Sequence, residues 1–459
     1  MRKLSLEHVG LIVVTGILLY LFTFHLGYTA LTSYDEAWYS QIARNLIISK
    51  NPLTLTFNNQ IFIDHPPFGY ILMALTMAGL GVSEFTARLT SVISGVGCLI
   101  LLYLLGKKLG GRAVGIGASA VLFSSLWFVI RTRSGNLDVP FLFFEIATVY
   151  VLLLKGKRAL WLGAFSFAAL ILTKTLVGFG LLPVIIFIVY TRRKEFKAIE
   201  ILQALALYFA LVLPWYVANQ LRDHNFLTHH FIEIGTRGSS NSFALSAILS
   251  KTQYLAIGVG KWFKIFLLSL GLAIAGVLKK STRTKSVTLL VWLLGFVPFL
   301  LSSETAVWHL LPLYPPVALC TSFFIFTVLR SIFPKKKFLT YLVVAGFVVL
   351  SVFQFHQFSN LVYMPEPVFS VEKDISLKAG KYDTIHLMDT FYPAAVFYSR
   401  KPIDALHWDG RAYQKMLALL GSTDDVFIIN QQYKSDLERD QIPFVVLESN
   451  QSYFLIRRP

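Results

Sequence analysis

The sequence predicts a mainly α-helical membrane protein, a polytopic bundle of about eleven transmembrane helices followed by a small C-terminal α/β domain. Composition predicts the bundle: 55% of the 459 residues are hydrophobic, only 15% are charged, and the mean hydropathy is +0.62. The C-terminal domain is predicted by a change of pattern after about residue 357, where short apolar runs alternate with polar turns. The net charge of +17 comes from small basic clusters between apolar runs. Because these clusters do not share one soluble face, we expect no nucleic-acid partner.

Eleven apolar runs could each form a helix across a bilayer core, which takes roughly 20 residues. The first run continues to about Ala30 without the small-residue pattern of a cleavage site, so we expect a retained span. The eleven runs cover approximately residues 9–30, 86–106, 113–130, 139–154, 159–173, 176–190, 199–219, 256–278, 286–301, 309–329 and 338–356.

The loops between these runs alternate in charge. Lys and Arg cluster in every second loop, and the positive-inside bias makes those loops and the N-terminus cytoplasmic. The opposite loops carry the unusual acids, which include Asp35, Glu36, Asp64 and Asp138. An odd number of spans then places the C-terminal domain outside. We therefore predict a multi-pass plasma-membrane protein with an extracytoplasmic site.

The loop between the first two runs is too apolar for a free tail and is expected to lie on the bilayer. Over residues 35–48, Trp38, Ile42 and Leu46 recur at four-residue spacing, which predicts a helix in the interface plane. Asp35 would lie in the first turn of that helix, where backbone N–H groups and the helix dipole favour an ionised carboxylate.

The same loop contains the turn Asp64-His65-Pro66-Pro67. Its two prolines fix the backbone and start another short apolar helix over residues 68–81. A rigid turn of this kind can hold Asp64 and His65 in place.

The C-terminal part predicts a separate α/β domain over residues 357–459, after a transmembrane domain over residues 1–356. Its strands and helices follow from apolar runs bounded by polar turns. We expect strands at 384–388, 425–429 and 444–447, and helices at 411–420 and 433–440.

Charged side chains also interrupt apolar sequence at two later outer positions. Arg131, Arg133 and Asp138 lie at membrane ends, where charge is costly unless it pairs or binds something, and a guanidinium suits phosphate. The alternative is two arginines that extend to the interface beside a helix-capping Asp138. Lys174 lies at an outer helix junction, against the charge bias, which favours a point charge for a lipid phosphate.

The loop after about residue 219 contains candidate metal ligands. His229 and Glu233 are one helical turn apart, and with Asp64 they could hold a divalent metal; interfacial histidines without a metal are the alternative. Further on, His309 and Tyr314 lead into a span, where they either face a cavity or anchor the helix at the interface.

Five motifs, in this order, resemble the GT-C glycosyltransferases, in particular the branch of the protein O-mannosyltransferases and the aminoarabinose transferase of lipid A. The resemblance covers about residues 1–330, and the trailing domain is also similar to many members. It implies transfer of a sugar from a polyprenyl-phosphate carrier to an acceptor on the outer membrane face. The motifs are Tyr34-Asp35-Glu36-Ala37, Asp64-His65-Pro66-Pro67, Arg133-Ser134-Gly135-Asn136-Leu137-Asp138-Val139-Pro140, Leu172-Thr173-Lys174 and His309-Leu310-Leu311-Pro312.

The resemblance also implies roles for single residues. Asp35 matches the catalytic aspartate of the family, and Asp138 matches a second acid near the same cavity. His65 departs from the pattern, because relatives have there a lysine that contacts the donor phosphate. Histidine carries full charge only when protonated. Either His65 binds phosphate as a hydrogen-bond donor, or Lys174 and Arg133 replace it.

Two further positions depart from the family. His309 stands where relatives often have tyrosine. The outer loop keeps Glu233 and Arg237 but has Ile234 where relatives have histidine, which weakens the argument for a metal. The substrate cavity is expected to be lined by Tyr34, Glu36, Asp64, His309 and Tyr314.

The residue chemistry agrees with inverting transfer. An acceptor hydroxyl needs a carboxylate to take its proton, a role that Asp35 can fill. Glu36 projects about 100° away from Asp35 on a helix and is expected to orient the loop or to pair with an arginine such as Arg44 or Arg88. No cofactor is required, and the acceptor is a lipid, a glycan or a protein. The leaving polyprenyl phosphate stays anionic and needs fixed cations, which His65, Arg131, Arg133, Lys174 and Arg237 could supply.

Two other functions fit part of the pattern. A multispan flippase or transporter of lipid-linked sugars would also carry intramembrane charges, but it would need a polar path across the bilayer. The unusual charges here cluster toward one face, which favours an enzyme. A third interpretation makes the C-terminal domain the functional part, but eleven spans exceed what an anchor needs.

Overall fold

The computed structural model describes residues 6–234, 245–300 and 306–459. Tertiary contacts divide the chain into two compact units. Unit 1 comprises Met1–Phe24, Ile63–Gly69 and Leu89–Tyr363, and unit 2 comprises His25–Phe62, Tyr70–Arg88 and Met364–Pro459. Arg237, one of the predicted phosphate ligands, lies outside the described residues.

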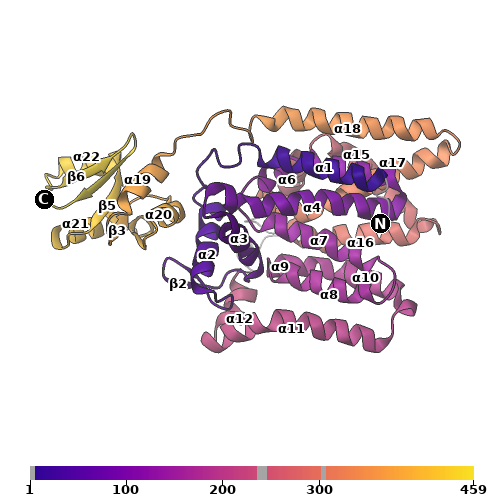
Figure 1. Ribbon diagram of the computed structural model, residues 1–459, viewed down its shortest axis with the longest axis horizontal. Coiled ribbons are helices and arrows are strands. Elements are labelled where there is room, and N and C mark those ends of the chain that lie inside the picture. Colours follow the sequence, from indigo (N-terminus) through magenta and orange to yellow (C-terminus); the bar gives the residue numbers. More distant parts are fainter. Residues whose placement is uncertain (1–5, 235–244, 301–305) are drawn as a thin grey trace. The chain divides into compact units, whose positions relative to one another are not determined.

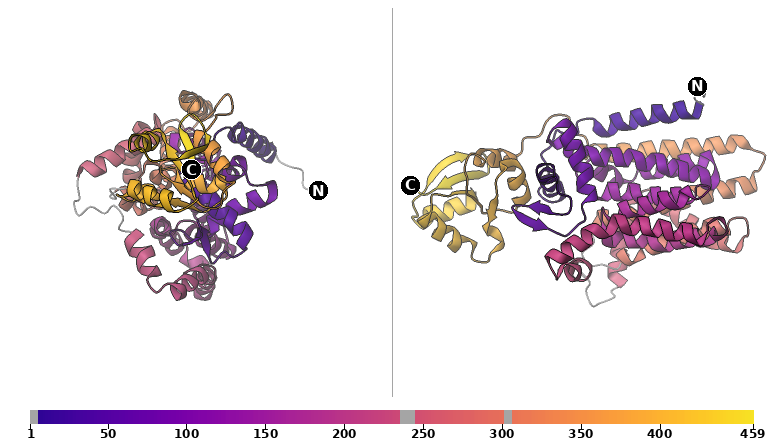
Figure 2. Two further views of the ribbon diagram at one scale, coloured as in Figure 1. Left: turned by 90° about the vertical axis from the view of Figure 1, so that its left-hand side faces the viewer. Right: turned by 60° about the horizontal axis from the view of Figure 1, so that its bottom comes forward.

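Unit 1 is a bundle of apolar helices whose longest members run roughly parallel (Figures 1 and 2). A helix or a pair of helices stands at each of the eleven predicted runs. The helices are α1 (Leu6–Thr23), α4 (Glu84–Gly110, in this unit from Leu89), α5 (Arg112–Phe123), α6 (Leu126–Thr132), α7 (Asp138–Leu152), α8 (Arg158–Ile171), α9 (Thr175–Gly178), α10 (Leu182–Thr191), α11 (Ala198–Arg222), α12 (Phe226–Thr228), α14 (Leu245–Val259), α15 (Trp262–Leu278), α16 (Arg283–Gly295), α17 (Tyr314–Ile332) and α18 (Lys337–Ser359), with the short turns η1 (Phe179–Leu181), η2 (Arg193–Glu195), η3 (His229–Glu233), η4 (Val297–Leu300) and η5 (Val307–Leu313).

Five helical segments among the described residues are long and apolar enough to cross a membrane: α1, α4, α11, η5 with α17, and α18. The number rises to seven if α5 with α6 and α14 with α15 each count as one bent span. The remaining predicted spans are helices of fewer than 18 residues. The protein is thus an integral membrane protein, and the number of eleven spans stays a prediction.

Both bends have a local cause. The pair α5 and α6 is bent by 73° at Ser124-Ser125, whose hydroxyls donate to the carbonyls of Ala120 and Val121 and compete with the helix ladder. The pair α14 and α15 is bent by 113° at Gly260, which has a φ of +67°, a backbone conformation that glycine adopts without strain. The predicted continuous runs 113–130 and 256–278 are therefore interrupted helices.

Unit 2 contains most of the loop that follows α1. The helices α2 (Asp35–Ser49) and α3 (Phe68–Leu80, in this unit from Tyr70) confirm the two short helices predicted there. The extended segment between them is an antiparallel hairpin of β1 (Leu55–Phe57) and β2 (Gln60–Phe62). The turn of this hairpin is Asn58-Asn59, both with positive φ, as the tightest hairpin turns require.

The rest of unit 2 is built on a mixed five-stranded sheet in the order β4-β3-β5-β7-β6. The strands β3, β4 and β5 are parallel, and β7 is antiparallel to β5 and β6. The elements are α19 (Val371–Ala379), β3 (Ile385–Leu387), α20 (Tyr392–Ser399), β4 (Ile403–Ala405), η6 (Leu406–Trp408), α21 (Ala412–Ser422), β5 (Val426–Asn430), α22 (Gln431–Arg439), β6 (Val445–Ser449) and β7 (Tyr453–Arg457).

The three predicted strands and two predicted helices of this part are present within a few residues of the expected bounds. On one face of the sheet, Phe427, Ile429 and Ile456 pack with Met416 of α21 and Leu437 of α22. Alternating residues along β5 explain this packing, because successive side chains point to opposite faces.

Candidate functional site

The predicted charges of unit 1 meet at a buried carboxylate. Arg131 Nε and Nη2 donate to Asp138 Oδ2 at 3.1 and 2.6 Å, and Lys174 Nζ donates to Asp138 Oδ1 at 2.8 Å. Arg131 and Asp138 are each only 7% exposed. Both oxygens of the carboxylate are engaged by cations, which favours its ionised form and makes it a poor proton acceptor. These three side chains form what we term the Asp138 cluster.

Breaks between helices place the three side chains. Arg131 is in the last turn of α6, Asp138 begins α7, and Lys174 lies in the extended break between α8 and α9. The structure thus confirms the prediction that Lys174 lies at a helix junction. It also shows that Arg131 pairs with Asp138, so this arginine is not simply extended toward the interface.

Asn136 holds the turn between Arg131 and Asp138. Its Nδ2 donates to the carbonyls of Arg131 and Ser134 at 2.6 and 2.8 Å, and its Oδ1 accepts from Val139 N at 3.0 Å. Asn136 therefore caps α7, a role that the alternative interpretation gave to Asp138. An asparagine shortly before a helix is a known capping signal, so this role was open to prediction from the sequence.

His65 lies near the Asp138 cluster and is partly exposed. The turn that carries it is tied to the same break as Lys174, because Phe68 N donates to Leu172 O at 2.9 Å. Burial, and then the nearby ammonium of Lys174, lower the pKa of His65 to about 3. His65 is thus a neutral imidazole in the physiological pH range and can bind phosphate only by hydrogen bonding.

The segment before α17 forms another wall. The guanidinium of Arg131 lies 5.0 Å from the ring centroid of Trp308, in cation–π geometry, and His309 is partly exposed beside it. Tyr314, predicted as a cavity residue, is 1% exposed, and its hydroxyl has no hydrogen-bond partner among the described residues. If residue 258 had a Cβ atom, that atom would lie only 1.8 Å from the Tyr314 hydroxyl. Gly258 therefore leaves the space in which Tyr314 packs.

Arg133 points to a different place from Arg131. Its Nη1 donates to the carbonyls of Phe22 and Leu21, at 2.8 and 3.4 Å, near the C-terminal end of α1. Its guanidinium also lies 4.3 Å from the ring centroid of Tyr363. A cation on the last carbonyls of a helix stabilises the helix end. This geometry gives Arg133 a structural task, where the resemblance implied a phosphate ligand.

The three candidate metal ligands lie together but do not converge. His229 Nδ1 is 2.7 Å from Glu233 Oε2, and its Nε2 is 3.5 Å from Asp64 Oδ1. The two nitrogens lie on opposite edges of the imidazole, so one ion bound to either nitrogen could reach only one of the carboxylates. No set of three or more His, Cys, Asp or Glu side chains suited to a metal occurs in the described part of the chain. These residues do not fit a metal site.

The adjacent acids Asp35 and Glu36 belong to unit 2, and their side chains lie in two different environments. Glu36 is 2% exposed and forms a two-pronged ion pair with Arg88, at 2.8 and 3.0 Å, and it accepts from Thr32 N at 2.9 Å. This confirms the expected pairing of Glu36 with an arginine. Asp35 is the first residue of α2 and is partly exposed, and Tyr34 before it is exposed.

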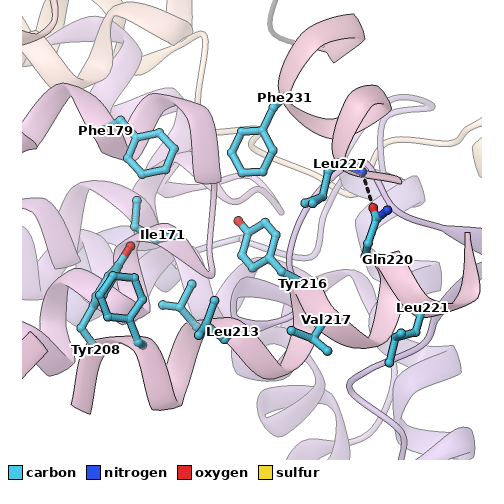
Figure 3. A pocket seen from close by; sticks show the side chains of 12 residues that line it. Ile171, Phe179, Tyr208, Leu213, Tyr216, Val217, Gln220, Leu221, Leu227 and Phe231 are labelled. Atoms are coloured by element: carbon cyan, nitrogen blue, oxygen red, sulfur yellow. Dashed lines mark hydrogen bonds between the residues drawn. The ribbon is translucent and has the colours of Figure 1, made fainter. Parts of the chain in front are cut away.

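An apolar groove of about 430 Å³ lies along α11 in unit 1. In Figure 3 the rings of Phe179, Tyr216 and Phe231 gather at this groove from η1, α11 and η3. Tyr216 shares a 2.5 Å hydrogen bond with Thr175, the residue next to Lys174. Because Thr175 directly follows Lys174 in the chain, this hydrogen bond links the groove to the Asp138 cluster. Its lining is Ile171, Phe179, Tyr208, Phe209, Val212, Leu213, Tyr216, Val217, Gln220, Leu221, Leu227 and Phe231.

Comparison with known families gives a match over residues 64–217 to the model of the dolichyl-phosphate-mannose-protein mannosyltransferases. A curated relative, the undecaprenyl phosphate-alpha-4-amino-4-deoxy-L-arabinose arabinosyl transferase of Pseudomonas savastanoi pv. phaseolicola, is 27% identical over 64% of this chain and 57% of its own length. The chain spans less than two thirds of the length of the first curated relatives that it matches.

Solved structures show the same fold. ArnT from Cupriavidus metallidurans bound to undecaprenyl phosphate superposes with a TM-score of 0.77 at 14% identity, over 98% of this chain and 97% of ArnT. The oligosaccharyltransferase of Archaeoglobus fulgidus in its apo form gives a TM-score of 0.61 at 12% identity, over 96% and 69% of the two chains. In its family-model match, its curated relatives and its fold, the chain is similar to membrane glycosyltransferases, among them the dolichyl-phosphate-mannose-protein mannosyltransferases and the aminoarabinose transferases.

Proposed function

We propose that this protein transfers a sugar from a polyprenyl phosphate to an acceptor on the extracytoplasmic membrane face. The observation that carries the proposal is the Asp138 cluster, in which two fixed cations flank one buried carboxylate. A polyprenyl phosphate leaves as an anion, and cations that are already in position stabilise that charge without reorganisation. The curated relative described above is a transferase that its name links to undecaprenyl phosphate. These relatives do not favour a flippase.

Lys174 is proposed to contact the donor phosphate. Its ammonium has three protons, and one of them is donated to Asp138. The side chain is 16% exposed, so it is accessible to a ligand while Asp138 holds its position. Arg131 has a planar donor group suited to phosphate oxygens and is held by Asp138 and Trp308. Asp138 is thereby a positioning residue for both cations.

Asp35 is proposed as the general base. It is a partly exposed carboxylate at the start of α2, and a carboxylate that a substrate can reach is suited to take a proton from an acceptor hydroxyl. Asp138 is less suited to the role, because both of its oxygens already accept from cations. In the reaction, the acceptor oxygen attacks the anomeric carbon, the bond to the phosphate oxygen breaks, and the acceptor proton moves to the carboxylate.

The apolar groove along α11 is proposed to hold the first part of the prenyl chain. Most of its lining is aliphatic or aromatic, and Tyr216 links it to Thr175 beside Lys174. A lipid with a phosphate at Lys174 would therefore have an apolar surface close to its head group. This arrangement separates recognition of the phosphate from recognition of the chain.

The proposal is tested with Lys174→Met in purified full-length protein. We expect loss of transfer from undecaprenyl-phosphate sugars by about 100-fold or more, the typical effect of removing one charge-stabilising donor, and loss of thermal protection by undecaprenyl phosphate. Lys157→Met, which changes an exposed lysine before α8, is the matched control and should leave both unchanged. Full transfer by Lys174→Met, or no protection of the wild-type protein by any polyprenyl-phosphate sugar in a panel, would contradict the proposal.

A further inference from the structure

Two polar atoms close to Asp35 in the chain have no hydrogen-bond partner in the part of the protein that the structure describes. They are Oγ of Ser33 and the indole Nε1 of Trp38, and both atoms are buried. Each residue as a whole is partly exposed, so a substrate can approach it. A buried polar atom without a partner costs free energy that a hydrogen bond would recover. Beside the proposed base, such atoms are suited to bind the substrate.

The two side chains lie on either side of the proposed base at the start of α2. Ser33 precedes Asp35 by two residues, and Trp38 follows it by three. Residues three apart on a helix lie on the same face, with their Cβ atoms roughly 5 to 6 Å apart. The indole of Trp38 is therefore a neighbour of the Asp35 carboxylate.

Hydrogen bonds fix the segment that carries Ser33. Leu31 N donates to the hydroxyl of Tyr398 at 2.7 Å, and Thr32 N donates to Glu36 Oε2 at 2.9 Å. Ser33 directly follows these two anchored residues. Its hydroxyl therefore has a defined place before the first turn of α2.

Aromatic packing fixes the indole of Trp38. Its ring stacks on Phe57 of β1, with the centroids 4.7 Å apart and an interplanar angle of 22°. Phe57 is 5% exposed and meets Tyr392 edge to face at 5.5 Å. The ring of Phe62 of β2 lies 6.3 Å from the indole. The hairpin thus sets the plane of the indole and the direction of its N–H, and a donor that is already oriented loses little entropy on binding.

The chemistry of these atoms selects the ligand. An indole N–H can only donate, so it needs an acceptor oxygen, whereas the hydroxyl of Ser33 can donate or accept. The nearby carboxylate of Asp35 repels anions, which disfavours a phosphate oxygen as the partner of Trp38. A neutral hydroxyl fits both atoms. Under the proposed function, the transferred sugar lies within reach of Asp35 and carries several hydroxyls.

We propose that Trp38 and Ser33 bind two hydroxyl groups of the transferred sugar and thereby select it. The inference rests on the proposed function and deepens it, because it assigns residues that determine which sugar is transferred. Trp38 Nε1 donates to one sugar oxygen, and Ser33 Oγ binds a second hydroxyl. A sugar that lacks either hydroxyl leaves a buried polar group unpaired, and sites of this kind reject such analogues strongly.

The experiment measures how much the sugar of the donor adds to binding. The probes are undecaprenyl phosphate and a panel of undecaprenyl-phosphate hexoses and pentoses, with mannose and 4-amino-4-deoxyarabinose included. Each is titrated into purified full-length protein, and the shift of the unfolding temperature gives its dissociation constant. We expect at least one sugar donor to bind the wild type more tightly than undecaprenyl phosphate. A panel in which no sugar adds affinity would overturn the inference.

The decisive variant is Trp38→Phe, which keeps an aromatic ring against Phe57 and removes the N–H. We expect it to bind the preferred sugar donor about tenfold more weakly, the effect of one lost hydrogen bond. Undecaprenyl phosphate should bind as before, which also reports an intact fold. Trp408→Phe is the matched control and should change neither affinity, since Trp408 is a 68% exposed tryptophan of unit 2 far from α2 in the chain. Unchanged affinity of Trp38→Phe for the sugar donor would overturn the inference.

Ser33→Ala tests the second contact, and donors that each lack one sugar hydroxyl identify the partner of each residue. This variant should also bind the complete donor about tenfold more weakly. For each variant, one deoxy donor should bind variant and wild type equally, because the contact is already missing. If each variant weakens every deoxy donor as much as the complete donor, neither atom meets a sugar hydroxyl and the inference fails.

Failure of the inference and failure of the proposed function give different results. If undecaprenyl phosphate protects the wild type but both variants bind the sugar donor as the wild type does, the sugar contacts fail and the proposed function stands. If neither undecaprenyl phosphate nor any sugar donor protects the wild type, the proposed function fails, and the inference fails with it.

Discussion

The charge of single side chains decides what the Asp138 cluster can do. Asp138 accepts from Arg131 and Lys174 through separate oxygens, so each cation has a fixed direction. Relatives are implied to have a lysine at the position of His65, where this chain has a group that is neutral in the physiological range. Under the proposed function, Lys174 and Arg131 are the charged groups of this cluster that contact the donor phosphate, so the fixed positive charge lies at the helix breaks and not in the turn.

The low pKa of His65 predicts an acid-sensitive fold. An unfolded chain protonates this histidine near its ordinary pKa of about 6.5, whereas the folded protein resists protonation until about pH 3. Between about pH 6.5 and pH 3 the unfolded state therefore binds more protons than the folded state. The free energy of unfolding is thus unaffected by His65 above about pH 6.5 and decreases as the pH falls below that value. The charged or titratable groups that act on it are Lys174, His230, Asp138 and His309.

His65→Gln removes this titration. We expect the unfolding temperature of the variant to fall less than that of the wild-type protein between pH 7.5 and pH 4.5, measured by thermal unfolding in detergent. His224→Gln, which changes an exposed histidine after α11, is the control and should keep the wild-type slope. A His65→Gln slope equal to that of the wild type would show that His65 is already protonated or does not titrate differently in the fold.

At the scale of helices, the approach of α14 to α17 depends on one glycine. Gly258 lies in α14, and a Cβ there would be 1.8 Å from the hydroxyl of Tyr314 and 3.0 Å from Cδ1 of Trp127. Gly258→Ala should therefore force the two helices apart and destabilise the protein by about 1 to 3 kcal/mol, as overpacking does. The double variant with Tyr314→Phe removes the closest atom and should recover part of the loss.

The measurement is a double-mutant cycle of unfolding temperatures. Gly346→Ala is the control, since a Cβ at Gly346 in α18 meets no atom within 4 Å and the change should have little effect. A Tyr314→Phe single variant that loses transfer but not stability would instead give the hydroxyl a role in the substrate cavity. Additive effects of the two substitutions would contradict the steric explanation.

The sequence predicted the helices and helix breaks that depend on a local sequence signal. Helix α2, the Pro66-Pro67 start of α3 and the break at Lys174 follow from four-residue apolar spacing, proline geometry and a charge in an apolar run. The strands β4 and β7 were not predicted, because Ile403–Ala405 is only three residues long and Tyr453–Arg457 lies at the end of the chain without a following turn. The bends at Ser124-Ser125 and Gly260 were also missed, since hydropathy does not record the direction of a helix.

At the scale of the whole chain, the sequence identified charged side chains in apolar surroundings, but it did not predict what each one contacts. Arg131 and Arg133 look equivalent in sequence, but they lie on different sides of a helix end, and only Arg131 meets Asp138. The segment before α2 is held by the hydrogen bond from Leu31 to Tyr398, 367 positions away, so no local pattern could indicate it. The grouping of His25–Phe62 and Tyr70–Arg88 with the C-terminal part in unit 2 likewise results from tertiary contacts that no local pattern indicates.

The bundle as a whole is proposed to bind a lipid substrate from the bilayer, and this predicts a dependence on chain length. Leu213 lines the groove along α11 and is 47% exposed, so Leu213→Trp would fill the groove without disturbing the core. If the prenyl chain lies there, the variant should raise KM for undecaprenyl-phosphate sugars severalfold but leave KM for donors with one or two prenyl units nearly unchanged. The long and the short donors carry the same phosphate and sugar, so the variant should change kcat little for either donor.

The control for this experiment is Leu202→Trp, which adds the same ring to an exposed position of α11 outside the groove. It separates blocking of the groove from a general effect of a bulky side chain on the membrane-facing surface. Equal KM changes for long and short donors in Leu213→Trp would place the added ring near the phosphate and not along the chain. Unchanged KM for every donor would remove the groove from the donor path and leave the Asp138 cluster as the sole donor contact of the proposal.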